Sequence, residues 1–301
     1  MSEAALRTRI GGLALAAGAL AAIGAALRLR RDGAAAPAEV KRHLDAVLAA
    51  LDIPPLDRLD AGETARLYDL VVMILRHALE LLDNPTRPPG WNHTDAALLE
   101  AQGSASRFVV HLIAGAAAAR PELAALLGRP GVFLDVGTGV GWLAIEAARV
   151  WPALRVVAID IWEPALARAR HNVAASGLEG RIEVRAQDVT ALSDRAAFSL
   201  AWVPVPFFGT ATLSRVLTQV REALAPGAWV VCGIETAPEE PLARALSVLR
   251  LVRGGGEITM PAEVATHLTA AGFASVEIVP AGPLTLVFGR PPASENAIKD
   301  S

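Results

Sequence analysis

The sequence predicts an α/β fold with a mostly parallel sheet, an antiparallel last strand and an N-terminal helical cap. After residue 130, short apolar runs alternate with stretches of helical periodicity. The first run, VFLDVG at 132–137, leads directly into a glycine-rich loop. The last two runs, FASVEIVP at 273–280 and LTLVFGR at 284–290, have no helix between them. The final strand should therefore be antiparallel to its neighbour.

The helical region comes first in the chain. Apolar residues at three- and four-residue steps predict an amphipathic helix over residues 62–83. The segment DNPTRPPGWNH at 83–93 breaks this helix, because it contains three prolines and a glycine. A second helical stretch is expected over 94–119, with an interruption near Gly103. No segment before residue 120 has the pattern of a strand.

The α/β region follows in regular alternation. The expected elements are strand 132–137, helix 140–151, strand 154–160, helix 163–177, strand 181–189, strand 198–205, helix 212–227, strand 228–235, helices near 238–253 and 261–271, and strands 273–280 and 284–290. The expected division of the chain is an apolar segment at 1–31, a helical cap at 32–130, an α/β domain at 131–292 and a flexible tail at 293–301.

The composition excludes several function classes. Hydrophobic residues make up 53% of the 301 positions, which is enough for a sizeable core. The net charge of −3, without a dense basic block, argues against nucleic acid as a partner. A single cysteine, Cys232, excludes an intrachain disulfide and a cysteine-rich metal site, and we predict no metal. The only tyrosine is Tyr68, and the only lysines are Lys41 and Lys299. The Tyr-x-x-x-Lys pair that some hydride-transfer enzymes use is therefore absent.

The N-terminal segment is a candidate membrane anchor. Residues 10–27 carry no charge, and arginines lie on both sides of them. Eighteen residues are near the lower limit for a helix that spans a bilayer, and many of these are alanine or glycine. The alternative is an alanine-rich helix that lies on the protein or on a bilayer surface. We expect a cytoplasmic protein with this segment as its candidate membrane contact.

The stretch FLDVGTGVGW at 133–142 predicts a ligand site. Glycine follows Asp135 at every second position, and a strand, a glycine loop and a helix N-terminus together expose N–H groups to an anionic or polar ligand. Two further acids make the signal more specific. Asp160 ends the second strand, where an acid can accept both ribose hydroxyls, and Asp188 lies near the end of the third. Considered singly, either acid could instead cap a helix or a turn.

With these motifs in place, the sequence resembles the class I S-adenosylmethionine-dependent methyltransferases over residues 131–290. The resemblance rests on LDVGTGVG, VVAID, RAQDV and REALAPGAWVV, with Ala228 in place of the second glycine of the family's LrPGG turn. It implies a Rossmann-like seven-stranded methyltransferase sheet with an antiparallel last strand. It also implies S-adenosyl-L-methionine as the cofactor.

The resemblance assigns the cofactor-binding residues by position. The methionine part of the cofactor would lie against the loop, the ribose against the end of the second strand, and the adenine against the end of the third; Trp162 could stack on the base or pack on the sheet. The residues expected to bind the cofactor are Asp135, Gly137, Thr138, Gly139, Gly141, Asp160, Ile161, Trp162, Gln187, Asp188 and Val189.

Two other functions compete with a methyltransferase. A nicotinamide-dependent oxidoreductase uses similar glycine spacing, but it explains neither Asp188 nor the antiparallel last strand. A protein that binds S-adenosylmethionine without catalysis would carry the same loop and acids, because these motifs report binding and not turnover.

The methyl acceptor is expected to be a small, partly apolar molecule, with oxygen favoured as the methylated atom. The fourth strand leads into AWVPVPFFG at 201–209, where amino-methylating relatives carry Asp or Asn in a D/N-P-P-Y/F motif. Val205 precedes Pro206 here, so methylation of an amide- or adenine-type nitrogen is in doubt. Trp202 and Phe207, with Gln102, are the candidate acceptor-binding residues, although either aromatic ring could pack under the strand instead.

The candidate catalytic residues are His93 and Glu235. Glu235 follows the fifth strand, where some small-molecule O-methyltransferases place a histidine that this chain lacks. His93 lies in the polar segment PGWNHTDAALLEAQG and could accept a proton near neutral pH. The alternative for this segment is a helix N-cap formed by Asn92 or Thr94.

Overall fold

The computed structural model describes residues 1–292, and the predicted tail at 293–301 lies outside the described residues. The chain forms two compact units. The first contains Met1–Pro85 and Asp95–Ala105, and the second contains Thr86–Thr94 and the chain from Ser106 onward. The predicted helical region of 32–130 therefore contributes to both units.

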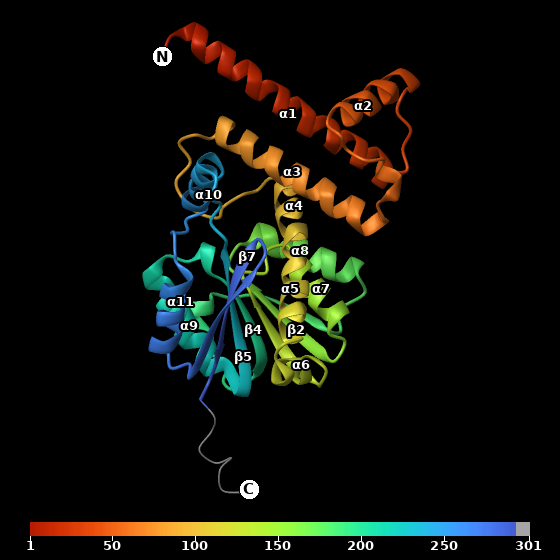
Figure 1. Cartoon of the computed structure of the whole chain (residues 1–301). Helices are drawn as coiled ribbons and strands as arrows, with labels where there is room; N and C mark the ends of the chain where they lie inside the picture. Colours follow the sequence, from red (N-terminus) through yellow and green to blue (C-terminus); the bar gives the residue numbers. More distant parts are fainter. Residues whose placement is uncertain (293–301) are drawn as a thin grey trace, which may run out of the picture. The chain divides into compact units, whose positions relative to one another are not determined.

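The first unit is helical (Figure 1). Its elements are α1 (Glu3–Asp32), α2 (Ala38–Ala50), a short 3-10 helix η1 (Leu56–Arg58), α3 (Ala61–Asp83) and α4 (Ala96–Ser106), the last of which ends at the boundary between the units. A capping box starts α3, because Asp60 accepts from the Glu63 N–H and the Glu63 side chain accepts from the Asp60 N–H. Close packing joins α1 to α3, since a Cβ added at Gly24 would lie 2.8 Å from Val71 Cγ1.

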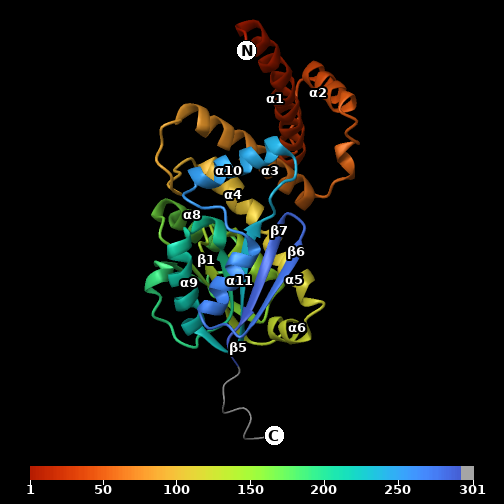
Figure 2. The same cartoon turned by 60° about the vertical axis from the view of Figure 1, so that its left-hand side comes forward.

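The second unit contains a sheet that has seven strands within the described residues, in the order β3-β2-β1-β4-β5-β7-β6 (Figure 2). The strands are β1 (Gly131–Val136), β2 (Leu154–Asp160), β3 (Ile182–Ala186), β4 (Phe198–Pro204), β5 (Leu224–Glu235), β6 (Ser275–Ala281) and β7 (Leu284–Arg290). The first five strands are parallel to one another, and β7 runs antiparallel to both of its neighbours, β5 and β6. The predicted fold class is confirmed.

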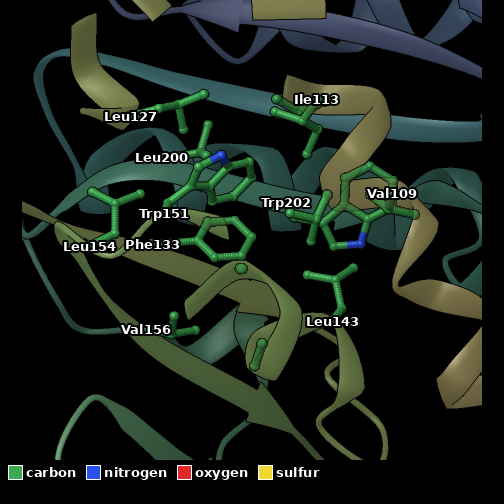
Figure 3. Close-up of a cluster of buried hydrophobic side chains, with 14 of the residues drawn as sticks. Val109, Ile113, Leu127, Phe133, Leu143, Trp151, Leu154, Val156, Leu200 and Trp202 are labelled. Carbon is green, nitrogen blue, oxygen red and sulfur yellow. The ribbon is translucent and has the colours of Figure 1, made fainter. Parts of the chain in front are cut away.

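Helices pack on both faces of this sheet. They are α5 (Phe108–Ala117), α6 (Pro121–Leu127), α7 (Trp142–Val150), α8 (Glu163–Ala175), α9 (Thr210–Ala223) and α11 (Pro261–Ala270), with short 3-10 helices η2 (Val189–Ala191) and η3 (Val205–Phe207). Helix α10 (Pro241–Arg253) follows the loop after β5 and has no buried residue. Successive residues of β1 point to opposite faces. Phe133 packs in the cluster that includes α5, α6 and α7 (Figure 3). Leu134 packs in the cluster that includes α9 and α11.

Several predicted boundaries were wrong. The third strand ends at Ala186 because Asp188 already caps η2. The helix predicted to reach residue 227 ends at Ala223, and β5 begins at Leu224, which pairs with Phe198 of β4. The helical stretch 94–119 breaks at Arg107 and not near Gly103, and α6 was not predicted.

The strand order places a functional edge within this unit. The chain builds β1, β2 and β3 outward in one direction and then returns to add β4 on the other side of β1. Ligands of open parallel sheets bind beyond the carboxyl ends of the strands at such a switch point. The loops after β1, β2 and β4 are therefore the place to look for the site.

Candidate functional site

The loop after β1 depends on glycine for its backbone shape. Gly137, Gly139 and Gly141 have φ values of 68°, 57° and 83°, in the left-handed region that other residues rarely adopt. A Cβ at Gly141 would lie 3.2 Å from Ala169 Cβ, whereas the space beside Gly139 is open. The loop thus brings bare backbone to the edge of the sheet directly before α7.

Asp135 is a buried acid at the start of this loop. Its side chain is 1% exposed, and the Thr138 hydroxyl donates to Oδ2 over 2.7 Å. Oδ1 is buried and has no hydrogen-bond partner among the described residues. Burial, with a smaller contribution from the charge of Asp160, raises the pKa of Asp135 to about 7 despite the opposing effect of the hydrogen bond from Thr138. A buried carboxylate oxygen without a partner suits a cationic group of a ligand.

Asp160 connects the loop after β1 with the loop after β2. Its Oδ2 accepts from the Gly139 N–H over 2.8 Å, and its Oδ1 accepts from the Trp162 N–H over 2.9 Å. A carboxylate has about four acceptor positions, so capacity for two ribose hydroxyls remains. Next to it, Ile161 is 74% exposed.

The loop after β3 holds the residues predicted to line the adenine. The Gln187 N–H donates to the Asp160 carbonyl over 2.9 Å, and Val189 is buried. The Asp188 carboxylate accepts from the Thr190 N–H over 2.8 Å and caps η2, which is the capping role that the sequence left open.

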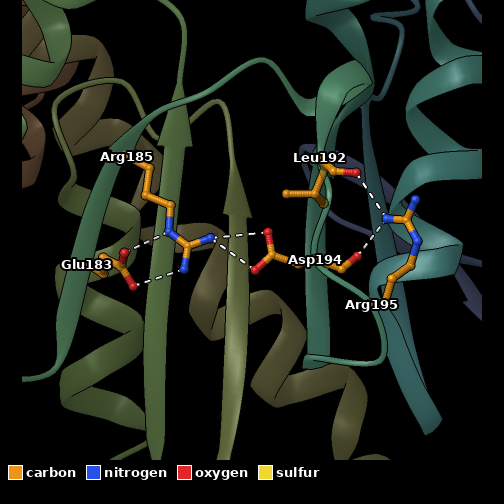
Figure 4. A network of polar contacts seen from close by, with 5 residues as sticks. All are labelled: Glu183, Arg185, Leu192, Asp194 and Arg195. Carbon is orange, nitrogen blue, oxygen red and sulfur yellow. Dashed lines mark hydrogen bonds and ion pairs between the residues drawn. The ribbon is translucent and has the colours of Figure 1, made fainter.

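Arg185 of β3 fixes the far end of this loop (Figure 4). Its guanidinium donates to both oxygens of Glu183 at 2.8 and 3.0 Å and to both oxygens of Asp194 at 3.1 and 3.2 Å. The hydrogen bond from Arg185 lowers the pKa of Glu183. The loop that carries the predicted adenine contacts is therefore held to the sheet at both of its ends.

His93 is 6% exposed and belongs to the second unit. Its ring lies edge-on to Trp91 with 4.8 Å between centroids, and its carbonyl accepts from Trp162 Nε1 over 2.8 Å. The cap of α4 is formed by Asp95, which accepts from the Leu98 N–H over 2.8 Å, and not by Asn92 or Thr94.

The predicted acceptor-side residues are not all brought together. Phe207 is 42% exposed and lies edge-on to Trp91 with 5.2 Å between centroids. Trp202 is 5% exposed and packs in the hydrophobic cluster beside Val109 and Leu143, so packing accounts for its position (Figure 3). Gln102 lies in the first unit, where its Oε1 is 3.2 Å from His77 Nε2.

Glu235 ends β5 and is ion-paired. Its Oε2 lies 2.6 Å from an Arg250 nitrogen of α10 and accepts from the Ser247 hydroxyl over 3.2 Å. The Glu235 carboxylate is therefore already engaged by Arg250 and Ser247. Sequence reasoning missed both Arg250 and Trp91. Trp91 could have been found, because it is an aromatic residue two positions before His93 in a proline-rich break.

Comparison with known proteins agrees with this geometry. A family model described as "Methyltransferase domain" matches residues 133–227. The chain is 36% identical over 119 residues to the ribosomal protein L11 methyltransferase of Sorangium cellulosum, a match that covers 39% of this chain and 36% of that protein. It is 30% identical over 194 residues to the release factor glutamine methyltransferase of Cereibacter sphaeroides, with 58% of this chain and 66% of that protein covered. The first of these matches thus spans about a third of its relative.

Solved structures extend the likeness to almost the whole chain. An O-methyltransferase family protein from Burkholderia thailandensis has a TM-score of 0.67 at 16% identity, with 98% of this chain and 100% of that chain covered. Human N-acetylserotonin methyltransferase in complex with SAM has a TM-score of 0.66 at 14% identity, with 98% and 99% covered. At these identities the likeness concerns the fold alone.

The residues present fit S-adenosylmethionine. The unpartnered Oδ1 of Asp135 suits the cationic methionine part, the glycine loop leaves room for close approach, and Asp160 can accept from a ribose. Residues 133–227 match the methyltransferase family model, and the strand order and this donor set agree with the class I S-adenosylmethionine-dependent methyltransferase fold that the sequence predicts.

Proposed function

We propose that the protein transfers the methyl group to an oxygen atom of a small, partly apolar molecule. The observation that carries this proposal is a cavity of about 270 Å³ beside the ends of β4 and β5. Most of its wall is apolar, and its apolar lining includes Val205, Ile234, Val248, Leu251, Ile258 and Met260. Such a wall favours a small organic ligand with few polar groups.

The segment after β4 supports oxygen over nitrogen. Several sequence relatives are named for glutamine or adenine methylation, as in the release factor and tRNA1(Val) enzymes. At Val205-Pro206-Phe207 this chain lacks the Asp or Asn with which amino-methylating enzymes hold a planar nitrogen. The net charge of −3 also disfavours tRNA as the acceptor.

In this proposal the bound cofactor supplies an electrophilic methyl group, and the protein supplies position, desolvation and a proton acceptor. Asp135 and Asp160 hold the cofactor at the switch point of the sheet. The apolar cavity excludes water from the acceptor. Glu235 lines this cavity but is already paired with Arg250, so His93, which lies outside the cavity lining, is proposed as the proton acceptor.

An acceptor panel tests the proposal. Methyl-labelled cofactor is offered with apolar phenols and carboxylic acids, and separately with ribosomal protein, release factor and tRNA. We expect label on a small molecule, with an acceptor KM raised about 10-fold by Ile258→Asp, because one apolar contact in a pocket contributes about 1–3 kcal/mol. The donor Kd, measured by calorimetry, should not change.

Ile278→Asp is the matched control, since Ile278 is an exposed isoleucine of β6 that does not line the cavity. It should leave the acceptor KM unchanged. Label found only on protein or tRNA would contradict the proposal. If the protein binds S-adenosylmethionine but labels neither small molecules nor protein nor tRNA, the alternative of a non-catalytic S-adenosylmethionine-binding protein is favoured.

We also propose that the exposed part of α1 contacts a membrane. Among the described residues, α1 is the one helix that is long and apolar enough to cross a bilayer. Its most apolar 18-residue window has a mean hydropathy of 2.1, and 11% of that window is buried. Its C-terminal part is bound to the first unit, because Leu27 is 1% exposed and Arg30 donates to Thr64 over 3.2 Å. Because this part of α1 is packed on the first unit, a surface contact is favoured over a spanning helix.

Deletion of residues 2–22 tests this contact, because it spares Gly24, Leu27 and Arg30. We expect the truncated protein to leave the membrane fraction after cell lysis, while donor binding by calorimetry is retained. The control is Arg7→Ala, which keeps the apolar surface. Full-length protein recovered wholly in the soluble fraction without detergent would exclude the membrane contact.

A further inference from the structure

Residues 86–94, named here the strap, belong to the second unit although the chain on both sides of them belongs to the first. The strap is attached to the end of α10. The Gly90 N–H donates to the Arg253 carbonyl over 3.0 Å. A Cβ at Gly255 would lie 3.0 Å from Gly90 Cα, so the two backbones are in close contact.

The strap is also braced internally. The Arg87 guanidinium donates to the Gly90 carbonyl and to Asn92 Oδ1, both over 2.7 Å. The same guanidinium donates to the Arg253 carbonyl over 3.3 Å. These hydrogen bonds fix the first half of the strap against α10. A second attachment holds the half that contains Trp91 and His93.

Trp162 makes that second attachment. Its indole Nε1–H donates to the His93 carbonyl over 2.8 Å, and its backbone N–H donates to Asp160 Oδ1 over 2.9 Å. The side chain is half-buried at the start of α8. One residue therefore joins the strap to the acid that is expected to hold the cofactor ribose.

We propose that Trp162 is a positioning residue that couples cofactor binding at Asp160 to the placement of the strap. This inference rests on the proposed function in one respect, which is that the methyl acceptor binds on the side of the site where the strap lies. Asp160 also accepts from the Gly139 N–H, so its carboxylate joins the glycine loop and Trp162. Ribose hydroxyls donating to Asp160 would restrain this carboxylate, and the restraint would reach the strap through the two N–H groups of Trp162.

The coupling has a defined consequence for the site. His93 and Trp91 are in edge-on contact, and Trp91 in turn contacts Phe207 of η3, so the strap places two aromatic rings next to η3. Without the hydrogen bond from Trp162, the strap would keep its attachments at Arg87 and Gly90 and lose the one at His93. With the cofactor bound, Trp162 keeps His93 and Trp91 in place beside η3.

Hydrogen exchange of the amides of residues 90–94 tests the proposal. Trp162→Phe keeps the ring and removes the indole N–H. We expect exchange of these amides to be about 3- to 10-fold faster in the variant, as follows from the loss of one net hydrogen bond. S-adenosylmethionine should slow their exchange in the wild type and slow it much less in Trp162→Phe. Exchange of the β4 amides should not differ.

Trp229→Phe is the matched control, because Trp229 Nε1 is buried with no hydrogen-bond partner among the described residues. It should leave strap exchange unchanged. Equal exchange in wild type and Trp162→Phe, or an equal acceleration in Trp229→Phe, would overturn the proposal. Failure of the proposed function is distinguishable, because a different methyl acceptor would leave all of these exchange rates as expected.

Discussion

Replacing Asp135 by asparagine is expected to weaken the binding of S-adenosylmethionine at least about 30-fold while stabilising the free protein above pH 7. The carboxylate is fully buried, and its Oδ1 has no partner among the described residues, so it is the natural counter-charge for the cationic end of the cofactor. Removing one partner of a buried charge pair costs about 2–5 kcal/mol, which is a 30-fold or greater loss of affinity.

The effect on stability follows from the raised pKa of Asp135. Burial raises this pKa from 3.8 to about 7, so between these values the unfolded state releases a proton that the folded state keeps. The stability that this group contributes is greatest below pH 4 and is lost as the pH rises towards 7. At pH 8 the loss amounts to about 4 kcal/mol, and Asp135→Asn should remove this pH dependence.

Urea unfolding of the free protein at pH 5 and pH 8 measures the stability difference, and calorimetry measures donor affinity. Wild-type protein at pH 6 should release a proton when the donor binds, because the cationic ligand favours the ionised carboxylate. Asp45→Asn is the control, since Asp45 is an exposed acid paired with Lys41. Donor affinity retained in Asp135→Asn, with the same pH dependence as the wild type, would show that Asp135 does not face the cofactor.

Replacing His93 by alanine is expected to lower turnover about 10²- to 10⁴-fold, the usual cost of losing a general base. The ring is 6% exposed and contacts Trp91, and the strap that carries it is attached to the acid at the end of β2. Histidine is the side chain most often used as a general base in catalysis. Donor affinity should stay within about twofold, because the imidazole is not among the expected cofactor ligands.

Single-turnover kinetics with an acceptor found in the panel measures this effect, and calorimetry measures the donor affinity. Asn92→Ala is the control, because it alters the strap without removing a proton acceptor. A His93→Ala protein with full activity and a lowered melting temperature would leave His93 a structural residue. Glu235→Gln would then be the next variant to assay.

Local patterns in the sequence predicted most of the fold. The alternation of apolar runs with helical periodicity predicted the strands and the helices between them, and the helix-free connection at 280–283 predicted the antiparallel last strand. Glycines at 137, 139 and 141 predicted a loop with unusual dihedrals, and all three have positive φ. These features depend on residues that are adjacent in the chain, so residue type and spacing in the sequence are enough to predict them.

The boundaries that sequence reasoning missed involve competition between local and distant partners. Asp188 lies where the apolar pattern of the third strand continues, yet its side chain accepts from the Thr190 N–H and ends the strand. Leu224 follows a helical pattern, yet it pairs with Phe198 of β4. Periodicity alone cannot tell which of two partners a backbone group will take.

The sequence by itself determined that there is a glycine loop with acids at successive strand ends, because residue type and spacing specify that chemistry. Only the tertiary structure decided which side chains meet across the site. Trp202 is buried in the core, Glu235 pairs with Arg250, Gln102 lies in the other unit, and Trp162 holds the carbonyl of His93. Each of these placements depends on the strand order β3-β2-β1-β4-β5-β7-β6 and on packing between segments far apart in the chain, for which local periodicity carries no signal.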